Sequence, residues 1–329
     1  MSEIIINKLP SPTWHFLKMN NAAVERVCPP NDASIRSDGT ITKYRPLDEE
    51  TLLFGSCPEA VIVCENDEEK VSRVTIESSG EYSAAAVDIR ACENSELTVY
   101  VNIHGDRRLS VKINADIQKG AHVKLVATQL CKKSGELVCD IRSRVSECAA
   151  FTQLAFLPGT IGTYINTDAE LYGDNSRFVS HTSYLADEND KLDINCNVSH
   201  KGRRTESEIT ANGALDSNAQ KIFRGTIDFR RGSKGSHGSE TENVLLLSDD
   251  IINRTLPVIL CSEEDVNGTH GATIGDISGE TLMYFQSRGI SKEQAARLLK
   301  ASVADSFLHL VNDSDTTKLI GAETGDRYE

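Results

Sequence analysis

Alternation of apolar and polar residues dominates the middle of the chain. From about residue 60 to 262, short segments with a period of two recur, among them VSRVTIES at 71–78, ELTVYVNI at 96–103 and FVSHTSYL at 178–185. A period of two places successive side chains on opposite faces of a strand, and Gly, Asn, Asp and Ser separate the segments. The pattern predicts many short β-strands and no long helix in this region.

The predicted strands follow a loose repeat. A polar cluster precedes each one, and the first strand positions are Leu97, Val123, Phe151, Phe178 and Ile222. The steps between them are 26, 28, 27 and 44 residues, and we interpret 44 as two steps of 22. A strand-only repeat of this length is typical of a β-solenoid, in which each coil stacks on the last. A β-sandwich is the alternative, but tight hairpin signals are scarce.

The C-terminal region has a helical pattern instead. Leu282 and Phe285 share one face of a helix that Gly289 would end, and Ser291 with Gln294 forms a capping box for a second helix. The apolar stripe of the second helix comprises Ala295, Leu298, Leu299, Val303, Phe307 and Leu310. This stripe either packs on the chain's own core or forms a docking face for a partner.

These patterns divide the chain into four parts. We expect an N-terminal capping segment over 1–58 with a short helix near 22–27, and a β-helix core over 59–275. A helical tail follows over 276–312, and the polar residues 313–329 are expected to be flexible. The predicted fold class is an all-β core, a parallel β-helix, with a small C-terminal helical region.

Composition restricts the partners. The net charge of −14 argues against a nucleic-acid backbone and against an anionic membrane surface. No apolar run approaches the length of a membrane span and the N-terminus lacks a signal-peptide pattern, so we expect a cytoplasmic protein. Nine cysteines without any C-x-x-C spacing indicate neither a disulfide framework nor a self-contained zinc site.

One segment carries a detailed resemblance. His270-Gly-Ala-Thr is followed by Leu282-x-Tyr284-Phe285-x-x-Arg288-Gly-Ile, and NVLLLSDD precedes both at 243–250. This arrangement resembles the signature end of the SufB/SufD family, the scaffold proteins of the SUF system for iron–sulfur cluster assembly. The resemblance is detailed over about 225–303 and architectural over 60–225. It places the chain among short SufD-like members, because the large N-terminal helical region of the family is missing.

The resemblance implies a right-handed parallel β-helix whose end pairs with a SufB-like paralogue, or with a second copy of the chain. It implies that the tail helices dock an ABC-type ATPase resembling SufC, with a sulfur donor system acting indirectly. Carried onto this sequence, the docking residues are Leu282, Tyr284, Phe285, Arg288, Leu298 and Leu299. The chain has no GxxxxGK[ST] motif with which to hydrolyse ATP itself, and the resemblance implies a scaffold and not an enzyme.

His270 is, by the same resemblance, a ligand of a transient iron–sulfur cluster at the dimer interface. A neutral imidazole can ligate iron, and exchanging thiolate for imidazole changes cluster potential and lability. No permanently bound cofactor is implied. We expect His270 in a tight loop between strand and helix, where Gly268, Gly271 and Ala272 keep side-chain bulk away.

The source of a thiolate ligand stays open. SufB members carry Cys and Glu where this chain has Glu242 and Gly271, which favours the SufD branch and a thiolate from the partner chain. Cys261 is either a substitute thiol, as a homodimer would need, or a core residue. The run PVILC reads as a buried strand and favours the core.

Two further hypotheses have weaker support. A β-helix carbohydrate-active enzyme would use paired carboxylates, and Asp187, Glu188, Asp190 and Asp193 are clustered in sequence, although ADENDKLD reads better as a solvated turn. A chain of thiols could pass sulfur along the solenoid. The spacing of the cysteines on predicted strands does not support that route: Cys131, Cys139, Cys148 and Cys196.

Overall fold

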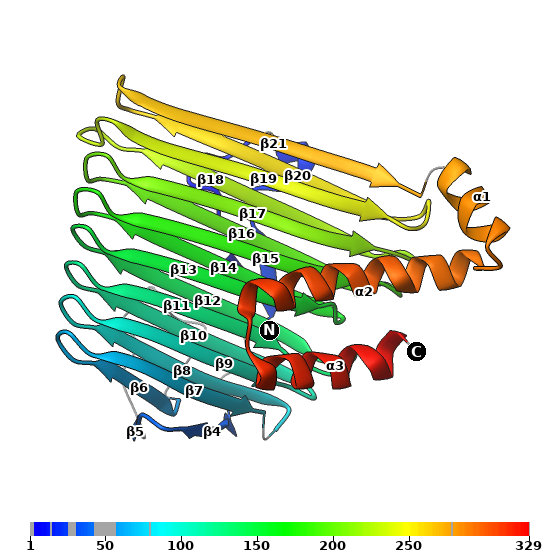
Figure 1. Cartoon of the computed structure of the whole chain (residues 1–329), viewed down its shortest axis with the longest axis horizontal. Coiled ribbons are helices and arrows are strands. Elements are labelled where there is room, and N and C mark those ends of the chain that lie inside the picture. The colour runs from blue at the N-terminus through cyan, green and yellow to red at the C-terminus, as the bar shows by residue number, and fades with distance from the viewer. Residues whose placement is uncertain are drawn as a thin grey trace.

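The centre of the chain is a coiled β-structure whose strands alternate between two sheets (Figure 1). This computed structural model describes residues 3–13, 15–25, 31–42, 57–78, 80–277 and 279–328. Even-numbered strands from β6 to β20 form one sheet and odd-numbered strands from β7 to β21 form the other, each pairing in parallel with the strand two places along. About eight turns result, which confirms the predicted parallel β-solenoid.

The solenoid strands are 6 to 11 residues long. In chain order they are β6 Glu59–Cys64, β7 Glu69–Glu77, β8 Tyr82–Ala91, β9 Glu96–His104, β10 Arg108–Ile117, β11 His122–Gln129, β12 Glu136–Val145, β13 Ala150–Pro158, β14 Gly162–Leu171, β15 Arg177–Ala186, β16 Lys191–His200, β17 Glu206–Leu215, β18 Gln220–Phe229, β19 Ser236–Leu246, β20 Ile252–Cys261 and β21 Val266–Asp276.

The sequence repeat corresponds to the register of the odd-numbered sheet. Leu97, Val123, Phe151 and Phe178 lie in line on β9, β11, β13 and β15. The interpretation of Ile222 as the next position was wrong, because Ile222 lies on β18 in the other sheet and Ser207 of β17 follows Phe178. A serine at an inward position breaks the apolar pattern from which the repeat was inferred.

One corner of seven successive coils, from β6–β7 to β18–β19, adopts a left-handed backbone. One residue at this corner of each of these coils has a positive φ angle and donates its N–H to a carbonyl of the next coil. Asn, Asp and Gly tolerate this conformation best. The corner residues are Asp67, Asn94, Gly120, Cys148, Asn175, Arg204 and Gly235. Cys148 was therefore wrongly assigned to a strand.

The core fills the lumen between the two sheets. Stacked side chains on successive even-numbered strands are all at most 4% exposed: Val111, Cys139, Ile165, Ile194 and Phe223. Burying a large apolar side chain contributes roughly 1.5–3 kcal/mol. Each coil therefore stabilises its neighbours, and only a terminal coil can expose the lumen.

The N-terminal segment covers the first coil and part of one outer face. β4 (Ser34–Ser37) and β5 (Thr40–Thr42) pair antiparallel with β7 and β6. β1 (Glu3–Ile6) and β2 (Ala22–Glu25) form a hairpin that packs on β12 and β14. The short helix expected near 22–27 was wrong for 22–25, which alternate in burial as a strand, and 26–27 lie outside the described residues. Two short elements, η1 (His15–Leu17) and β3 (Asn31–Asp32), complete this segment.

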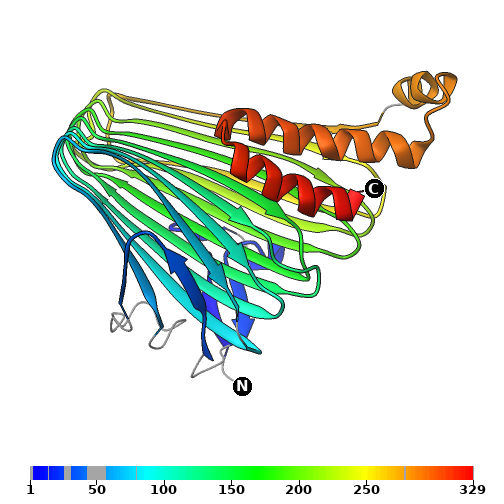
Figure 2. The same cartoon turned by 60° about the horizontal axis from the view of Figure 1, so that its bottom comes forward.

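Three helices follow the last strand: α1 (Gly279–Ser287), α2 (Lys292–Val311) and α3 (Ser314–Tyr328). The predicted capping box of Ser291 and Gln294 is confirmed. α2 lies along the outer face of the odd-numbered sheet, against β13, β15 and β17 (Figures 1 and 2). Phe307 of α2 is fully buried there, with its ring 5.3 Å from that of Phe156.

The C-terminal segment is helical where we expected a flexible end. Asp313 forms an ion pair with Arg73 at 2.7 Å and accepts hydrogen bonds from the backbone and hydroxyl of Thr316. Ile320 is fully buried. Arg73 also pairs with Asp315, and Thr316 is buried, so polar contacts hold the start of α3 and no apolar stripe in the sequence indicates it. Among the helices of the described residues, none combines the length and apolar character that a membrane span needs.

Candidate functional site

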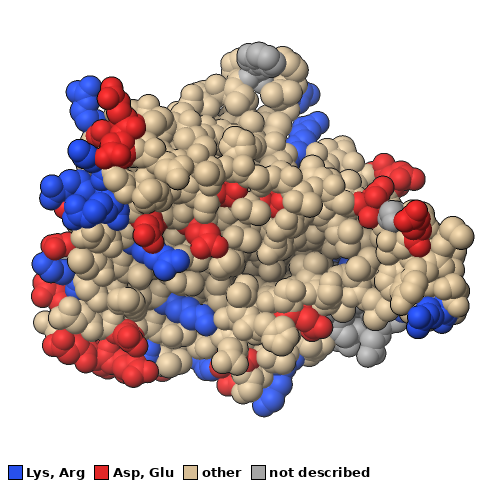
Figure 3. Space-filling view, turned by 45° about the horizontal axis from the view of Figure 1, so that its top comes forward, with Lys and Arg blue, Asp and Glu red and all other residues tan. Residues whose placement is uncertain are grey.

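The last coil, formed by β20 and β21, leaves one end of the molecule open. Within the described residues β20 pairs only with β18 and β21 only with β19, so their outer edges have no neighbouring strand. Every residue of these two strands is exposed or half-buried. Figure 3 brings this end forward and shows mainly uncharged side chains, with the densest charge along the left edge and a few charged side chains across the middle. An uncovered strand edge is a template for pairing with another chain.

His270 lies in the middle of β21 and is exposed. The predicted loop was wrong, because 266–276 continue the register of β19 and place His270 beside Glu240. Glu240 is 2% exposed and points into the lumen, so His270, its neighbour in register, faces the open lumen. Gly268 shares this face, since a Cβ there would lie 3.0 Å from the ring of Phe229.

Cys261 ends β20 and is exposed, so its interpretation as a core residue was wrong. Its neighbour in register is Phe229, which is fully buried. The apolar run PVILC is typical of a strand inside the stack, but within the described residues no further coil covers β20. The Cys261 thiol contacts the carbonyl of Glu263 at 3.0 Å. Among the described residues, no three His, Cys, Asp or Glu side chains are grouped closely enough to hold a metal ion.

A charged cluster lies in the lumen one coil below His270. Lys221 pairs with Glu242, and both side chains are at most 1% exposed. The Tyr184 hydroxyl donates to one Glu242 oxygen at 2.9 Å, and the Thr255 hydroxyl donates to the other. Both oxygens of Glu242 therefore have partners within the chain. Losing one member of such a buried pair typically costs about 3–5 kcal/mol.

Glu240 completes this lumen cluster of Tyr184, Lys221, Glu240, Glu242 and Thr255. Burial and the charge of Glu242 raise the pKa of Glu240 to about 8, and its Oε2 has no hydrogen-bond partner. Gly225 leaves room for the carboxyl group, since a Cβ there would lie 2.3 Å from the carboxyl carbon. The Glu240 carboxyl group is therefore expected to keep its proton at neutral pH.

Three of the four carboxylates that we considered for an enzyme site form ion pairs with lysine or arginine. Asp187 and Asp190 both pair with Lys133, and Asp193 pairs with Arg224 on the outer face of β16. Burial acts to raise the pKa of Asp187, but Lys133 and Lys300 outweigh it and lower the pKa. The solvated turn that we expected is thus an ion-pair network, and of the four residues only Glu188 is exposed.

The inner thiols do not form a reactive route. Cys139 and Cys196 are buried, and burial raises the pKa of both thiols. Cys131 is buried just after β11, and Cys148 is exposed at a corner. A thiol with a raised pKa carries little thiolate at neutral pH and is a poor nucleophile.

The helical tail presents an apolar face to solvent. α1 buries none of its residues and projects from the solenoid (Figure 2). Tyr284 is 57% exposed with Arg288 stacked over its ring at 5.1 Å, and Leu298 of α2 is 54% exposed. Met283, which the motif did not include, is 71% exposed. Leu282, Phe285 and Leu299 are half-buried.

The molecule is thus a parallel β-solenoid with one uncovered end and a projecting helical tail. The model of the family described as "SUF system FeS cluster assembly, SufBD core domain" matches residues 74–303, and the chain belongs to this family.

Curated relatives support the assignment. The chain is similar to the iron-sulfur cluster assembly protein SufD of Bacillus subtilis, with 28% identity over 137 residues that cover 42% of this chain and 31% of that protein. It is also similar to an iron-sulfur cluster assembly SufBD family protein of Staphylococcus epidermidis, with 22% identity over 201 residues that cover 60% of this chain and 43% of the relative. The chain thus spans less than half of the length of these relatives.

Proposed function

We propose that this chain is a non-catalytic scaffold subunit of a SUF-type assembly complex, in which an iron–sulfur cluster is built transiently between two chains. The observation that carries the proposal is the open end of the solenoid, where His270 is exposed over the lumen beside two unpaired strand edges. The cluster is cargo, formed there and then passed on. Membership of the SufBD core family supports a role in iron–sulfur cluster assembly.

His270 supplies a nitrogen ligand in this proposal, and a second chain supplies the remaining ligands. A mixed nitrogen and sulfur set suits a scaffold, because exchanging thiolate for imidazole changes how firmly the cluster is held. The preferred second chain is a SufB-like paralogue that contributes thiolate. Glu242 is an unsuitable ligand, because Tyr184, Lys221 and Thr255 already occupy its oxygens.

A homodimer is the second candidate arrangement, and the exposure of Cys261 favours it. In a homodimer this thiol would take the place of the partner's thiolate. Substituting Cys261 separates the two arrangements, since only the homodimer loses its cluster with Cys261→Ser.

The projecting helices are the proposed docking site of an ABC-type ATPase resembling SufC. Met283, Tyr284 and Leu298 together offer an exposed apolar face next to the open end of the solenoid. Such a face on a projecting helix pair is a common form of protein docking surface. A sulfur donor would act through the complex and not through the buried thiols of this chain.

An anaerobic co-expression experiment tests the proposal. The chain would be purified with the candidate ATPase and a SufB-like partner, as wild type, His270→Ala and His237→Ala, the last an exposed histidine of the adjacent strand β19. We expect all three complexes to form. The charge-transfer absorbance of the cluster should fall at least fivefold in His270→Ala only. Equal absorbance in all three would refute the role of His270.

A further inference from the structure

The two halves of α2 are attached to the solenoid in different ways. The second half buries Ala304, Phe307 and Val311 in an apolar cluster with Phe156 and Leu185 of the odd-numbered sheet. The first half fully buries only Ala295 and Lys300, with Ala296 and Leu299 half-buried against the same apolar cluster, and α1 before it buries nothing. The largest buried side chain in the first half is therefore a charged one.

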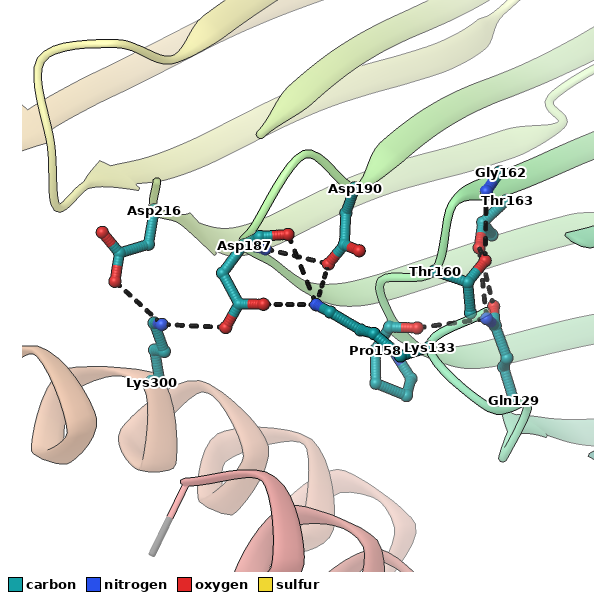
Figure 4. A network of polar contacts seen from close by, with 10 residues as sticks. All are labelled: Gln129, Lys133, Pro158, Thr160, Gly162, Thr163, Asp187, Asp190, Asp216 and Lys300. Atoms are coloured by element: carbon teal, nitrogen blue, oxygen red, sulfur yellow. Dashed lines mark hydrogen bonds and ion pairs between the residues drawn. The ribbon is translucent and has the colours of Figure 1, made fainter. Parts of the chain in front are cut away.

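A cleft separates the first half of α2 from the solenoid. It has a volume of about 570 Å³, and its walls are the turns after β15, β17 and β19 on one side and α2 on the other. Lys300 lies at this cleft, 6% exposed, and pairs with Asp187 at 3.0 Å and with Asp216 at 2.9 Å (Figure 4). These two ion pairs connect the helix to two successive coils.

Lys133 extends the network on the solenoid side. It pairs with Asp187 and Asp190, so Asp187 is shared between two lysines (Figure 4). If Lys300 left, Asp187 would still be paired with Lys133, and the side chain of Asp216, which is 19% exposed, could be hydrated. Separation would thus leave no unpaired buried carboxylate, which is the usual reason that a buried ion pair resists opening.

We infer that α1 and the first half of α2, residues 279–299, form a unit that can separate from the solenoid at Lys300 while Phe307 and α3 stay in place. The ion pairs set the angle of this unit relative to the open end of the solenoid. This separation is a property of the isolated chain, so it can be tested without the partners of the proposed function. If a partner docks on α1, Lys300 is the point at which that contact reaches the turns of the solenoid.

Hydrogen–deuterium exchange of the full chain tests the inference. A short helix detached from its support is marginal in water and exchanges quickly. The variant Lys300→Gln keeps most of the side-chain length and removes the charge. Asp216→Asn removes one of the two ion pairs, and Lys292→Gln changes an exposed lysine of the same helix that lines the same cleft.

We expect Lys300→Gln to accelerate exchange over 280–299 at least fivefold, with 303–320 unchanged. Asp216→Asn should give a smaller acceleration in the same segment, and Lys292→Gln none. Unchanged exchange over 280–299 in both charge variants would overturn the inference. So would equal acceleration from 280 to 320, which would mean that the tail moves as one body. Protection of the strands between 109 and 229 serves as the check that each variant is folded.

Discussion

At the scale of single residues, polar groups of the lumen divide into two sets by burial. Glu242, Lys221 and Tyr184 satisfy one another inside the solenoid, whereas His270, one coil further, is exposed. The motif around His270 identified the residue from sequence, but not its place in a strand. Cys261 shows the complementary error, because an apolar run predicts a strand but does not indicate that no coil covers it.

His200 gives a prediction about pH. Its ring nitrogens contact the hydroxyls of Thr205 at 2.7 Å and Ser207 at 2.8 Å, and burial lowers its pKa to about 4. Below its ordinary pKa of about 6.5, the unfolded chain binds a proton that the folded chain does not bind until about pH 4. The stability contributed by neutral His200 is therefore present above pH 6.5 and is lost as pH falls towards 4.

The loss should reach about 2–3 kcal/mol, since each unit of pKa shift corresponds to about 1.4 kcal/mol. Urea unfolding at pH 7, 5.5 and 4 would measure it. In His200→Gln the fall in stability between pH 7 and 4 should be smaller by this amount, even if the variant is less stable at pH 7. The same slope for variant and wild type would show that His200 is not the group responsible.

At the scale of elements, period-two alternation predicted the strands well because inward and outward positions alternate throughout the solenoid. The corners were less accessible to prediction. Their left-handed residues include Cys148 and Arg204 as well as Asn and Gly, so composition alone does not mark them. α3 escaped prediction because an ion pair of Asp313 with Arg73, distant in sequence, fixes its start.

The exposed face of α1 is expected to contribute to ATPase binding. Met283→Ser combined with Tyr284→Ala should weaken binding of the docked ATPase at least tenfold, because burying each large apolar side chain contributes roughly 1.5–3 kcal/mol. Binding can be measured by titration calorimetry. Ile41→Ser, which changes an exposed apolar residue of β5 on the first coil, is the matched control and should bind normally. Equal binding by all three proteins would place the ATPase elsewhere.

At the scale of the whole molecule, the two ends of the solenoid differ. β4 and β5 cover the first coil, whereas the last coil exposes both its strand edges and the lumen. The sequence repeat indicated a stack of coils, and the family resemblance led to the function proposed for its end. Neither the repeat nor the resemblance indicated which end of the solenoid is covered, because this depends on how the N-terminal segment folds back on the first coil.

Ile274 tests whether the open end is the pairing surface. It is 54% exposed on β21, next to buried Val244 in register. Ile274→Arg should abolish pairing with a second chain, since it would bury a charge without a partner. Light scattering coupled to size exclusion would report the mass of the complex. Val71→Arg, at an exposed valine of the first coil, should pair as the wild type does. Intact pairing of the Ile274 variant would move the interface to another surface.

The proposed function depends above all on the His270 imidazole binding the cluster at the open end. Pulsed electron paramagnetic resonance of the reduced cluster tests it most directly, in a complex where only this chain carries ¹⁵N-labelled histidine. We expect a ¹⁵N hyperfine coupling in the wild type that disappears in His270→Cys, although the cluster still forms. A wild-type cluster without ¹⁵N coupling, or the same coupling in both proteins, would contradict it.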